Sequence, residues 1–217
     1  MMTDRFLRWR TRLGGALWLL QPIYLLIEIA TAAQVIAPYS FLDNTISDLG
    51  ARECGSVDYP FGPVPVCSPW HAMMNGSFIL FGLGMALGAV LLRRALPSGR
   101  FATVSIVLWI VSGLSSVGTG LVPEDWNPAG HVAVSFPAFL AQPAALLAFG
   151  FVAGPRRGLG LSAVAAGLLS AVGTAAFMAR SGSPDLGGLF ERLSLWPAYL
   201  WLPIPAITAR TCPRREP

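Results

Sequence analysis

The chain has 217 residues, of which 54% are hydrophobic and only 12% are charged. An ordinary soluble domain has about 25% charged residues, so this composition excludes a disordered chain and a nucleic-acid-binding module. It also makes a water-soluble helical bundle the less favoured interpretation. The formal net charge is +4 and the 15 basic residues are all arginine, so the positions of the arginines carry the information on topology.

Six apolar stretches follow one another along the chain, and each is close to the roughly 20 residues that a helix needs to cross a bilayer. They cover residues 13–36, 70–92, 101–122, 129–153, 159–179 and 190–209. The rest of the chain consists of short loops, one longer loop over 37–69 and two tails, 1–12 and 210–217. We therefore predict a single domain over 13–209, an all-α polytopic membrane bundle of six transmembrane helices.

The arginines are distributed unequally between the two sides of this predicted bundle. Twelve of the 15 lie in the two tails and in the loops after the second and fourth stretches. The other side carries only Arg52, Arg180 and Arg192. Because Lys and Arg are enriched in cytoplasmic loops, we expect both tails to be cytoplasmic. The excess of Arg, Ala, Gly and Pro is typical of a high-GC bacterial genome, so we expect a bacterial inner membrane.

The first apolar stretch has a second interpretation. Arginines followed by an apolar run and the Ala-Thr-Ala-Ala sequence at 30–33 are also found in cleavable signal peptides. However, the run is longer than the usual 7–15 residues of such peptides, and Gln21, Pro22 and Glu28 interrupt it. We favour a retained helix, and cleavage would leave five spans.

The longer loop, 37–69, is predicted to lie outside the cell and contains Cys54 and Cys67. Gly and Pro dominate residues 55–69, so we expect irregular structure there. Two cysteines in an oxidising compartment predict a disulfide, with two free thiols as the alternative. The third cysteine, Cys212, is expected to be a passive thiol at the inner membrane surface, with palmitoylation as the alternative.

Polar residues inside the first stretch suggest a function. Gln21, Tyr24 and Glu28 are spaced by three and four residues and therefore share one helix face. Buried carboxyl groups in membranes are costly and often functional. The sequence offers no arginine inside a span to pair with Glu28, so we expect a protonated carboxyl that handles protons or contacts a ligand. The structural alternative is a hydrogen bond to another helix, with these candidate partners: Ser112, Ser115, Ser116, Thr119 and Gln142.

Other polar residues lie in the outer loop or at helix ends that the topology places on the outer side. Because such ends converge at one membrane face, we predict a polar site there. Its candidate residues are Glu28, Asn44, Ser47, Asp48, His71, Asn75, Asp125, His131, Glu191 and Arg192. Two histidines and a carboxylate would suffice for a zinc site, but their spacing matches no compact zinc motif. We therefore predict no metal and no cofactor, and expect capping and ion-pair roles, with Arg192 as a cation.

Small residues at helical spacing indicate close helix packing. Gly84 and Gly88 form a GxxxG pair, and a second stripe repeats every four residues in the fifth stretch. Its members are Ser162, Ala166, Ser170 and Thr174. Such faces also allow oligomerisation or packing against a partner protein.

Residues 39–50 read YSFLDNTISDLG and resemble the signature of a bacterial and archaeal membrane family, domain of unknown function 998. Shorter features elsewhere agree with it, namely Ser68-Pro69, Asn75, Pro123-Glu124-Asp125, His131 and the run Gly187–Leu193. The resemblance covers roughly residues 15 to 205, and the proline-rich insertion with two cysteines departs from it. It implies a compact six-helix membrane domain, and it brings no established reaction or catalytic residue. The chain is also distantly similar to the Frag1/DRAM/Sfk1 group.

Three functions are compatible with these features. The first is a non-enzymatic membrane protein that binds or moves a lipid or small amphiphile through an outward-facing polar cavity, with residues 39–50 as a polar lid. The second is an enzyme at the outer leaflet, either a hydrolase using histidine and a carboxylate or an acid-initiated isomerase or cyclase. The third is a structural or assembly subunit. We favour the first, with membrane lipid as the expected partner and no nucleic acid.

Overall fold

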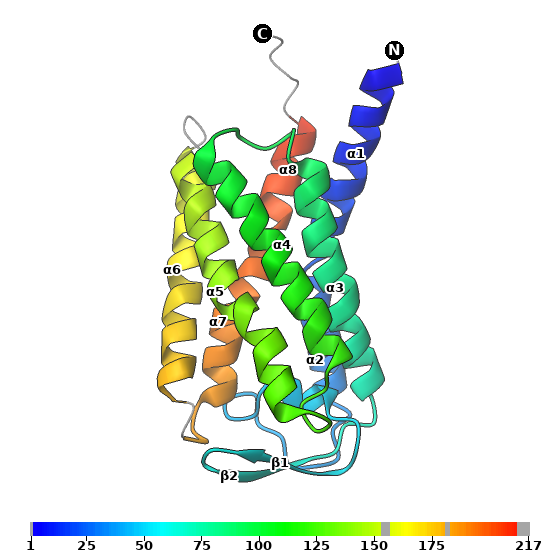
Figure 1. The fold of residues 1–217 in the computed structure, drawn as a ribbon, viewed down its shortest axis with the longest axis vertical. Coiled ribbons are helices and arrows are strands. Elements are labelled where there is room, and N and C mark those ends of the chain that lie inside the picture. Colours follow the sequence, from blue (N-terminus) through cyan, green and yellow to red (C-terminus); the bar gives the residue numbers. More distant parts are fainter. Residues whose placement is uncertain (1, 153–156, 181–182, 212–217) are drawn as a thin grey trace.

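The structure of the protein is a computed structural model that describes residues 2–152, 157–180 and 183–211. The fold is an all-α bundle whose long helices run side by side (Figure 1). The helices in the described residues are α1 (Met2–Leu19), α2 (Ile23–Ala32), α3 (His71–Leu92), α4 (Arg100–Leu121), α5 (Pro128–Val152), α6 (Arg157–Ala179), α7 (Gly187–Trp201) and α8 (Pro203–Thr211). A short 3-10 helix, η1 (Ser47–Gly50), lies in the long loop.

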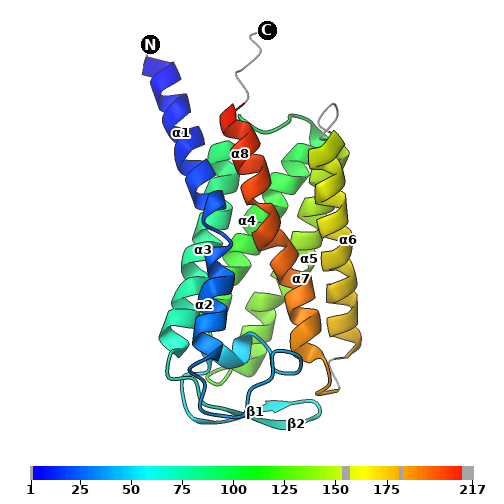
Figure 2. The ribbon, with the colours of Figure 1, turned by 180° about the vertical axis from the view of Figure 1, so that it is seen from behind.

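The helices pack in chain order around a closed ring. Helix α3 contacts α1 and α4, and α5 and α6 continue the ring to α7. The last helix, α8, packs against α1 and closes the ring, as the view from behind shows (Figure 2). The start of α1 and the end of α8 therefore lie at the same end of the bundle, and the long loop covers the other end.

Five helical segments are long and apolar enough to cross a membrane: Arg5–Ala32, His71–Leu92, Arg100–Leu121, Pro128–Val152 and Gly158–Ala179. They correspond to the first five predicted stretches. The sixth stretch is not one continuous helix, because it is divided into α7 and α8. Pro203 begins α8 and lacks the N–H that a continuous helix would need at that position.

The first segment is also interrupted, between α1 and α2. Pro22 follows Gln21 at the break, and its missing N–H disrupts the helical hydrogen bonds there. The side-chain amide of Gln21 lies 3.2 Å from the carbonyl oxygens of Leu17 and Phe81 and donates to them. Gln21 therefore satisfies the carbonyl oxygen of Leu17 next to the break, which is how membrane helices tolerate proline, and its second contact joins the break to α3.

The long loop between α2 and α3 contains regular structure where we had predicted none. Strands β1 (Gly55–Tyr59) and β2 (Gly62–Val66) form an antiparallel hairpin in which Gly55 pairs with Val66. Our expectation of irregular structure over 55–69 was wrong. The prolines of β2 are tolerated because a two-stranded sheet leaves the outer edge of each strand unpaired. The predicted disulfide between Cys54 and Cys67 is confirmed, and it joins the two residues that flank the hairpin.

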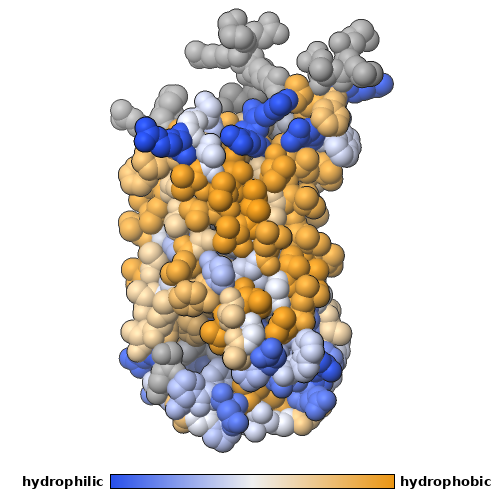
Figure 3. All heavy atoms as spheres, viewed as in Figure 1, coloured by the Kyte–Doolittle hydropathy of each residue, from blue (hydrophilic) through white to orange (hydrophobic). Residues whose placement is uncertain are grey.

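The surface has an apolar middle between two polar ends, as the space-filling view shows on one face (Figure 3). Large apolar side chains such as Leu80, Phe151, Leu161 and Val172 are more than half exposed along the middle of the bundle or near its ends. Water-soluble proteins rarely expose apolar patches of such extent. The bundle is therefore of the membrane type, with hydrocarbon as its surroundings.

The small residues noted in the sequence lie at helix contacts within the chain. A Cβ atom at Gly84 would lie 3.0 Å from the Gln21 amide nitrogen, and Gly88 faces the indole of Trp18. The hydroxyl of Thr174 donates to the carbonyl oxygen of Phe139 over 3.0 Å. These residues account for close packing inside the bundle, and oligomerisation through them stays a prediction.

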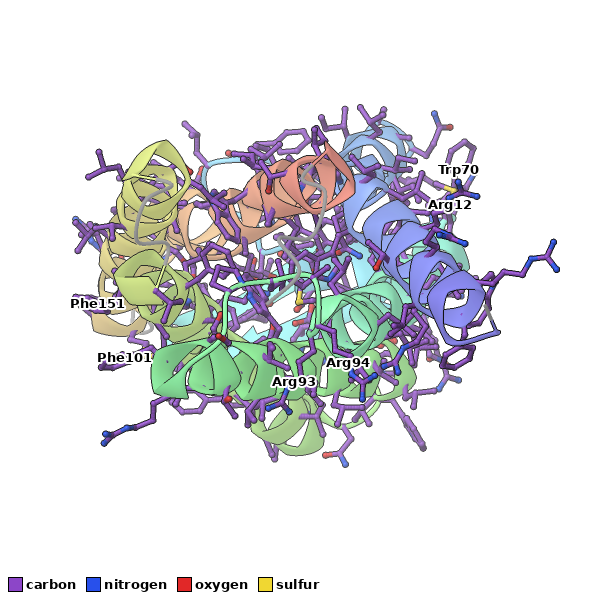
Figure 4. The ribbon with its side chains drawn as sticks, turned by 90° about the horizontal axis from the view of Figure 1, so that it is seen from above. Arg12, Trp70, Arg93, Arg94, Phe101 and Phe151 are labelled. Carbon is purple, nitrogen blue, oxygen red and sulfur yellow. A yellow bond between two sulfur atoms is a disulfide. The ribbon has the colours of Figure 1, made fainter. Side chains whose placement is uncertain are left out.

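Most described arginines gather at the end where α1 begins. Figure 4 looks down on that end and shows Arg12, Arg93 and Arg94 around it. Three of the arginines counted on this side, Arg156, Arg214 and Arg215, lie outside the described residues, as does Cys212.

Candidate functional site

Arg192 is buried in the first half of α7, where its side chain is 5% exposed. Its Nε donates to Glu28 Oε1 over 2.8 Å, and the indole N–H of Trp196 donates to the other oxygen over 2.9 Å. Two expectations are thereby corrected. Glu28 does have an arginine partner, because α7 begins at Gly187 and carries Arg192 into the bundle. The hydroxyl groups of α4 and the amide of Gln142, which we had named as possible partners of Glu28, do not bond to it.

The remaining nitrogens of Arg192 hold residues 39–50, which we call the cap segment. Nη1 donates to the carbonyl oxygens of Phe41 and Asn44 over 2.8 and 2.9 Å, and Nη2 donates to the Tyr39 hydroxyl over 2.5 Å. The guanidinium carbon also lies 4.8 Å from the centre of the Phe41 ring. An arginine has five N–H donors in a fixed fork, so one side chain can bind α2 and the cap segment together.

The cap segment also pairs with the first turn of α7. The N–H groups of Gly188 and Leu189 donate to the carbonyl oxygens of Asp43 and Leu42 over 3.0 and 2.8 Å. The first N–H groups of a helix have no partner within the helix, so the cap segment supplies acceptors for two of them. This pairing fixes residues 42 and 43 over the end of the bundle.

A second group of contacts binds η1 and the residue before it. Glu191 Oε2 accepts the N–H of Ile46 over 2.5 Å, and the amide of Asn75 donates to the carbonyl oxygen of Gly50 over 2.8 Å. A Cβ atom at Gly50 would lie 2.5 Å from Asn75 Oδ1, so a larger residue at this position would push the Asn75 amide away from its hydrogen bond with Gly50.

Four candidate residues meet at η1 and next to it. Asp48 accepts the side-chain amide of Asn44 over 3.0 Å and the Tyr59 hydroxyl over 2.8 Å. The same Tyr59 oxygen lies 3.0 Å from Glu124 Oε2. Ser47 Oγ lies 2.8 Å from His131 Nε2. The structure therefore brings Asn44, Ser47, Asp48 and His131 together with two residues that the predicted site omitted, Tyr59 and Glu124.

The hydrogen bonds around the Tyr59 hydroxyl indicate that Glu124 carries a proton. Burial and the nearby carboxyl groups of Glu124 and Asp48 raise the pKa of Tyr59, so its hydroxyl keeps one proton and can donate it once. When Asp48 receives that proton, Glu124 must itself donate to the Tyr59 oxygen. Burial, followed by the charge of Asp48, raises the pKa of Glu124 well above its ordinary value. Glu124 therefore holds the proton of its hydrogen bond with Tyr59.

Two predicted site residues lie apart from this cluster. Asp125 Oδ2 accepts the backbone N–H groups of Arg52 and Glu53 over 2.8 and 3.1 Å, which attaches the start of the hairpin region to the loop after α4. His71 lies at the start of α3, where its Nδ1 is 3.0 Å from the carbonyl oxygen of Ser68. Asp125 and His71 thus have local structural contacts.

The arrangement does not favour a metal site. Both ring nitrogens of His131 have hydrogen-bond partners, Ser47 and the carbonyl oxygen of Val122. Within the described ranges, no three His, Cys, Asp or Glu side chains are grouped so that they could hold a metal ion.

A small cavity with both polar and apolar lining residues lies beneath the cap segment, with Ser47 in its wall. Its volume is about 30 Å³, and a cavity needs roughly 10–15 Å³ by such a measure to hold one water molecule. The lining residues are Tyr24, Ser47, Phe78, Ser116, Thr119, Ser135, Ala138, Phe139, Gln142, Glu191, Leu195 and Tyr199. Among the described residues, Gln142 Oε1 and the Tyr24 hydroxyl are buried and have no hydrogen-bond partner. The cavity therefore offers unsatisfied polar atoms to a bound molecule.

Fold and site together define a multi-pass, all-α membrane protein with a polar cap at one end. Residues 19–208 match the family described as "Protein of unknown function (DUF998)", and the chain belongs to this family. The comparison with curated proteins found no match, and neither did the comparison with solved structures. The more distant similarity to the Frag1/DRAM/Sfk1 group stays a prediction.

The buried ion pair predicts a strong effect of removing either charge. Glu28→Gln keeps an acceptor for Trp196 but leaves the Arg192 charge uncompensated, which typically costs about 3–5 kcal/mol. Arg192→Lys keeps the charge but loses the planar fork, so we expect it to destabilise the protein as well. Unfolding in detergent measures both effects. Asp185→Asn, an exposed acid at the same end, is the control, and wild-type stability in either pair variant would contradict the prediction.

The proton on Glu124 predicts that stability falls as pH rises. Because the pKa of Glu124 is raised in the folded state, the folded protein binds more protons than the unfolded chain above about pH 4.5. The free energy of unfolding should therefore decrease between about pH 5 and the folded pKa. Melting temperatures measured across this range test the prediction. Glu124→Gln should flatten the dependence, whereas Glu53→Gln, which changes an exposed acid, should leave it as in the wild type.

Proposed function

We propose that this protein binds the headgroup of a lipid or small amphiphile at its outer end, beneath the cap segment. The polar cavity is the observation that carries the proposal. A buried polar atom without a partner costs about 1–3 kcal/mol, and Gln142 Oε1 and the Tyr24 hydroxyl both have this status among the described residues.

The carboxyl group of Glu191, which lines the cavity, favours a headgroup that carries an ammonium group. Among the described residues, the buried ionisable side chains at this end include four carboxyl groups, from Glu28, Asp48, Glu124 and Glu191. The buried cation among them is Arg192, which already pairs with Glu28. Excess buried carboxyl groups must be neutralised by protons or by a bound cation. An ammonium group supplies both charge and N–H donors for oxygen acceptors such as Gln142 Oε1.

The size of the cavity limits what it holds without movement. At about 30 Å³ it has room for one or two water molecules, so a headgroup enters only when the cap segment shifts. Phe78, Phe139 and Leu195 supply apolar wall on the same cavity. A pocket that combines polar groups with apolar walls suits a molecule with one polar and one apolar part.

Binding of a defined lipid tests this function. Native mass spectrometry of the delipidated protein should show one bound short-chain phosphatidylethanolamine, and weaker binding of the phosphatidylglycerol of equal chain length. Gln142→Leu removes the acceptor and should weaken binding about tenfold or more. Ser112→Ala removes a buried hydroxyl of α4 that does not line the cavity and should bind as the wild type does. Equal binding of both lipids would contradict the charge argument, and binding of neither would contradict the function.

We also propose a topology of six spans in a bacterial inner membrane, with both tails cytoplasmic. Helices α7 and α8 together would form the sixth span. The gathering of described arginines at the end where α1 begins supports this orientation, as does a disulfide at the opposite end, since disulfides persist in oxidising compartments.

Reporter fusions test the orientation. Alkaline phosphatase fused after Pro97, in the loop between α3 and α4, should be inactive, because this enzyme requires an oxidising compartment. The same enzyme fused after Phe61, in the turn of the hairpin, should be active. The opposite pair of results would reverse the topology.

A further inference from the structure

The contact between Ser47 and His131 joins the cap segment to the start of α5. Ser47 Oγ lies 2.8 Å from His131 Nε2. His131 is 6% exposed, and its other ring nitrogen, Nδ1, lies 2.7 Å from the carbonyl oxygen of Val122. The imidazole is therefore held from both sides, by the end of α4 on one side and by the cap segment on the other.

These two contacts determine which nitrogen carries the proton. A backbone carbonyl oxygen can only accept a hydrogen bond, so Nδ1 must be the protonated nitrogen that donates to Val122. In the neutral ring, Nε2 is then the free acceptor, and the Ser47 hydroxyl must donate to it. A serine hydroxyl that donates to a histidine whose other nitrogen is oriented by a third group is the arrangement of an activated nucleophile and its base.

The position of Ser47 gives this pair access to a bound molecule. Ser47 lines the polar cavity, together with the apolar side chains of Phe78, Phe139 and Leu195. A serine that served only to fasten the cap segment could equally have pointed away from the cavity. The fastening is also provided elsewhere, by the contacts of Arg192, Glu191 and Asn75.

We propose that Ser47 and His131 are the nucleophile and general base of an esterase that cleaves the acyl ester of the amphiphile bound beneath the cap segment. This inference rests on the proposed function for its substrate class. Ser47 Oγ forms a bond with the acyl carbon as its proton passes to His131 Nε2. The ester C–O bond then breaks, and the leaving alcohol takes that proton from Nε2. Water, deprotonated by His131, attacks the acyl-serine and releases the carboxylic acid, while the proton returns to Ser47.

The roles of the neighbouring groups follow from the same geometry. The Val122 carbonyl oxygen is a positioning group, because it fixes the ring orientation and the tautomer of His131. Asp48 follows Ser47 directly, but its oxygens accept Asn44, Thr45 and Tyr59 rather than the imidazole. The histidine–carboxylate hydrolase that the sequence had suggested is therefore replaced by a serine–histidine pair.

A small fluorophosphonate probe tests the activation of Ser47. In the wild-type protein in nanodiscs, we expect a covalent adduct in which Ser47 Oγ is bonded to phosphorus and fluoride has left. Peptide mass spectrometry locates the adduct. Ser47→Ala should abolish labelling, and Ser56→Ala, which removes an exposed serine on β1, should not change it. His131→Gln can keep a hydrogen bond to Ser47 but removes the base, so we expect the labelling rate to fall about 100-fold or more.

A second readout separates a chemical role of His131 from a structural one. In His131→Ala, added imidazole should restore labelling of Ser47 without restoring the melting temperature. Hydrolysis of a short-chain p-nitrophenyl ester should follow the same order among the variants. Labelling that is absent in the wild type, that maps elsewhere, or that survives His131→Gln overturns the inference.

The lipid-binding experiment distinguishes this failure from failure of the proposed function. Wild-type protein that binds short-chain phosphatidylethanolamine but is not labelled at Ser47 is a binding protein without this activity. Wild-type protein that is labelled at Ser47 but binds neither lipid has the nucleophile and a different substrate. Both results are read from the wild-type chain, so neither depends on whether a variant folds.

Discussion

The burial of one guanidinium group organises the end of the bundle that the cap segment covers. Arg192 is taken into the bundle by α7, and its charge is compensated by Glu28 of α2 over 2.8 Å. An arginine in the interior of a membrane protein requires both a counter-charge and acceptors for its other N–H groups. The carbonyl oxygens of Phe41 and Asn44 provide those acceptors. The cap segment is therefore bound to the bundle by the same side chain that holds α2 against α7.

Other hydrogen bonds to the cap segment follow the same pattern, because they too are made to its main chain. Arg192, Asn75 and the Ser68 hydroxyl each donate to cap carbonyl oxygens, while Glu191 accepts a cap N–H. Side chains outside the cap segment thus fix the position of its main chain by hydrogen bonds. The side chains of the cap are left to form the site itself, where Ser47 meets His131 and Asp48 meets Tyr59.

The site combines two kinds of proton chemistry at short range. The Glu124 carboxyl group holds a proton because burial and the neighbouring Asp48 raise its pKa. The His131 imidazole is held in one tautomer because Val122 offers only an acceptor. Ser47, the partner of His131, lines the cavity beneath the cap segment, so headgroup binding and ester cleavage would use a single region of the molecule.

The bundle and its family could be predicted from sequence, because long apolar stretches have few ways to satisfy their backbone groups in hydrocarbon. The order of the spans also predicts at which end of the bundle each loop lies. The disulfide could therefore be predicted from sequence, and so could the position at one end of Asn44, Ser47, Asp48 and His131. The hairpin was not predicted because its content of proline and glycine is also typical of irregular loops. Tyr59 and Glu124 were missed because nothing in their local sequence indicates a neighbour far along the chain.

The pairing of Glu28 with Arg192 shows most clearly where sequence reasoning ends. Hydropathy places α7 only approximately, and a difference of a few residues in its start moves Arg192 from the membrane surface to the interior. By itself, the sequence determined a polytopic helical bundle with polar residues at one end, because hydrophobic length is a local property. Only the tertiary structure decided which of those residues touch, because each contact joins segments that come together only when the ring of helices closes.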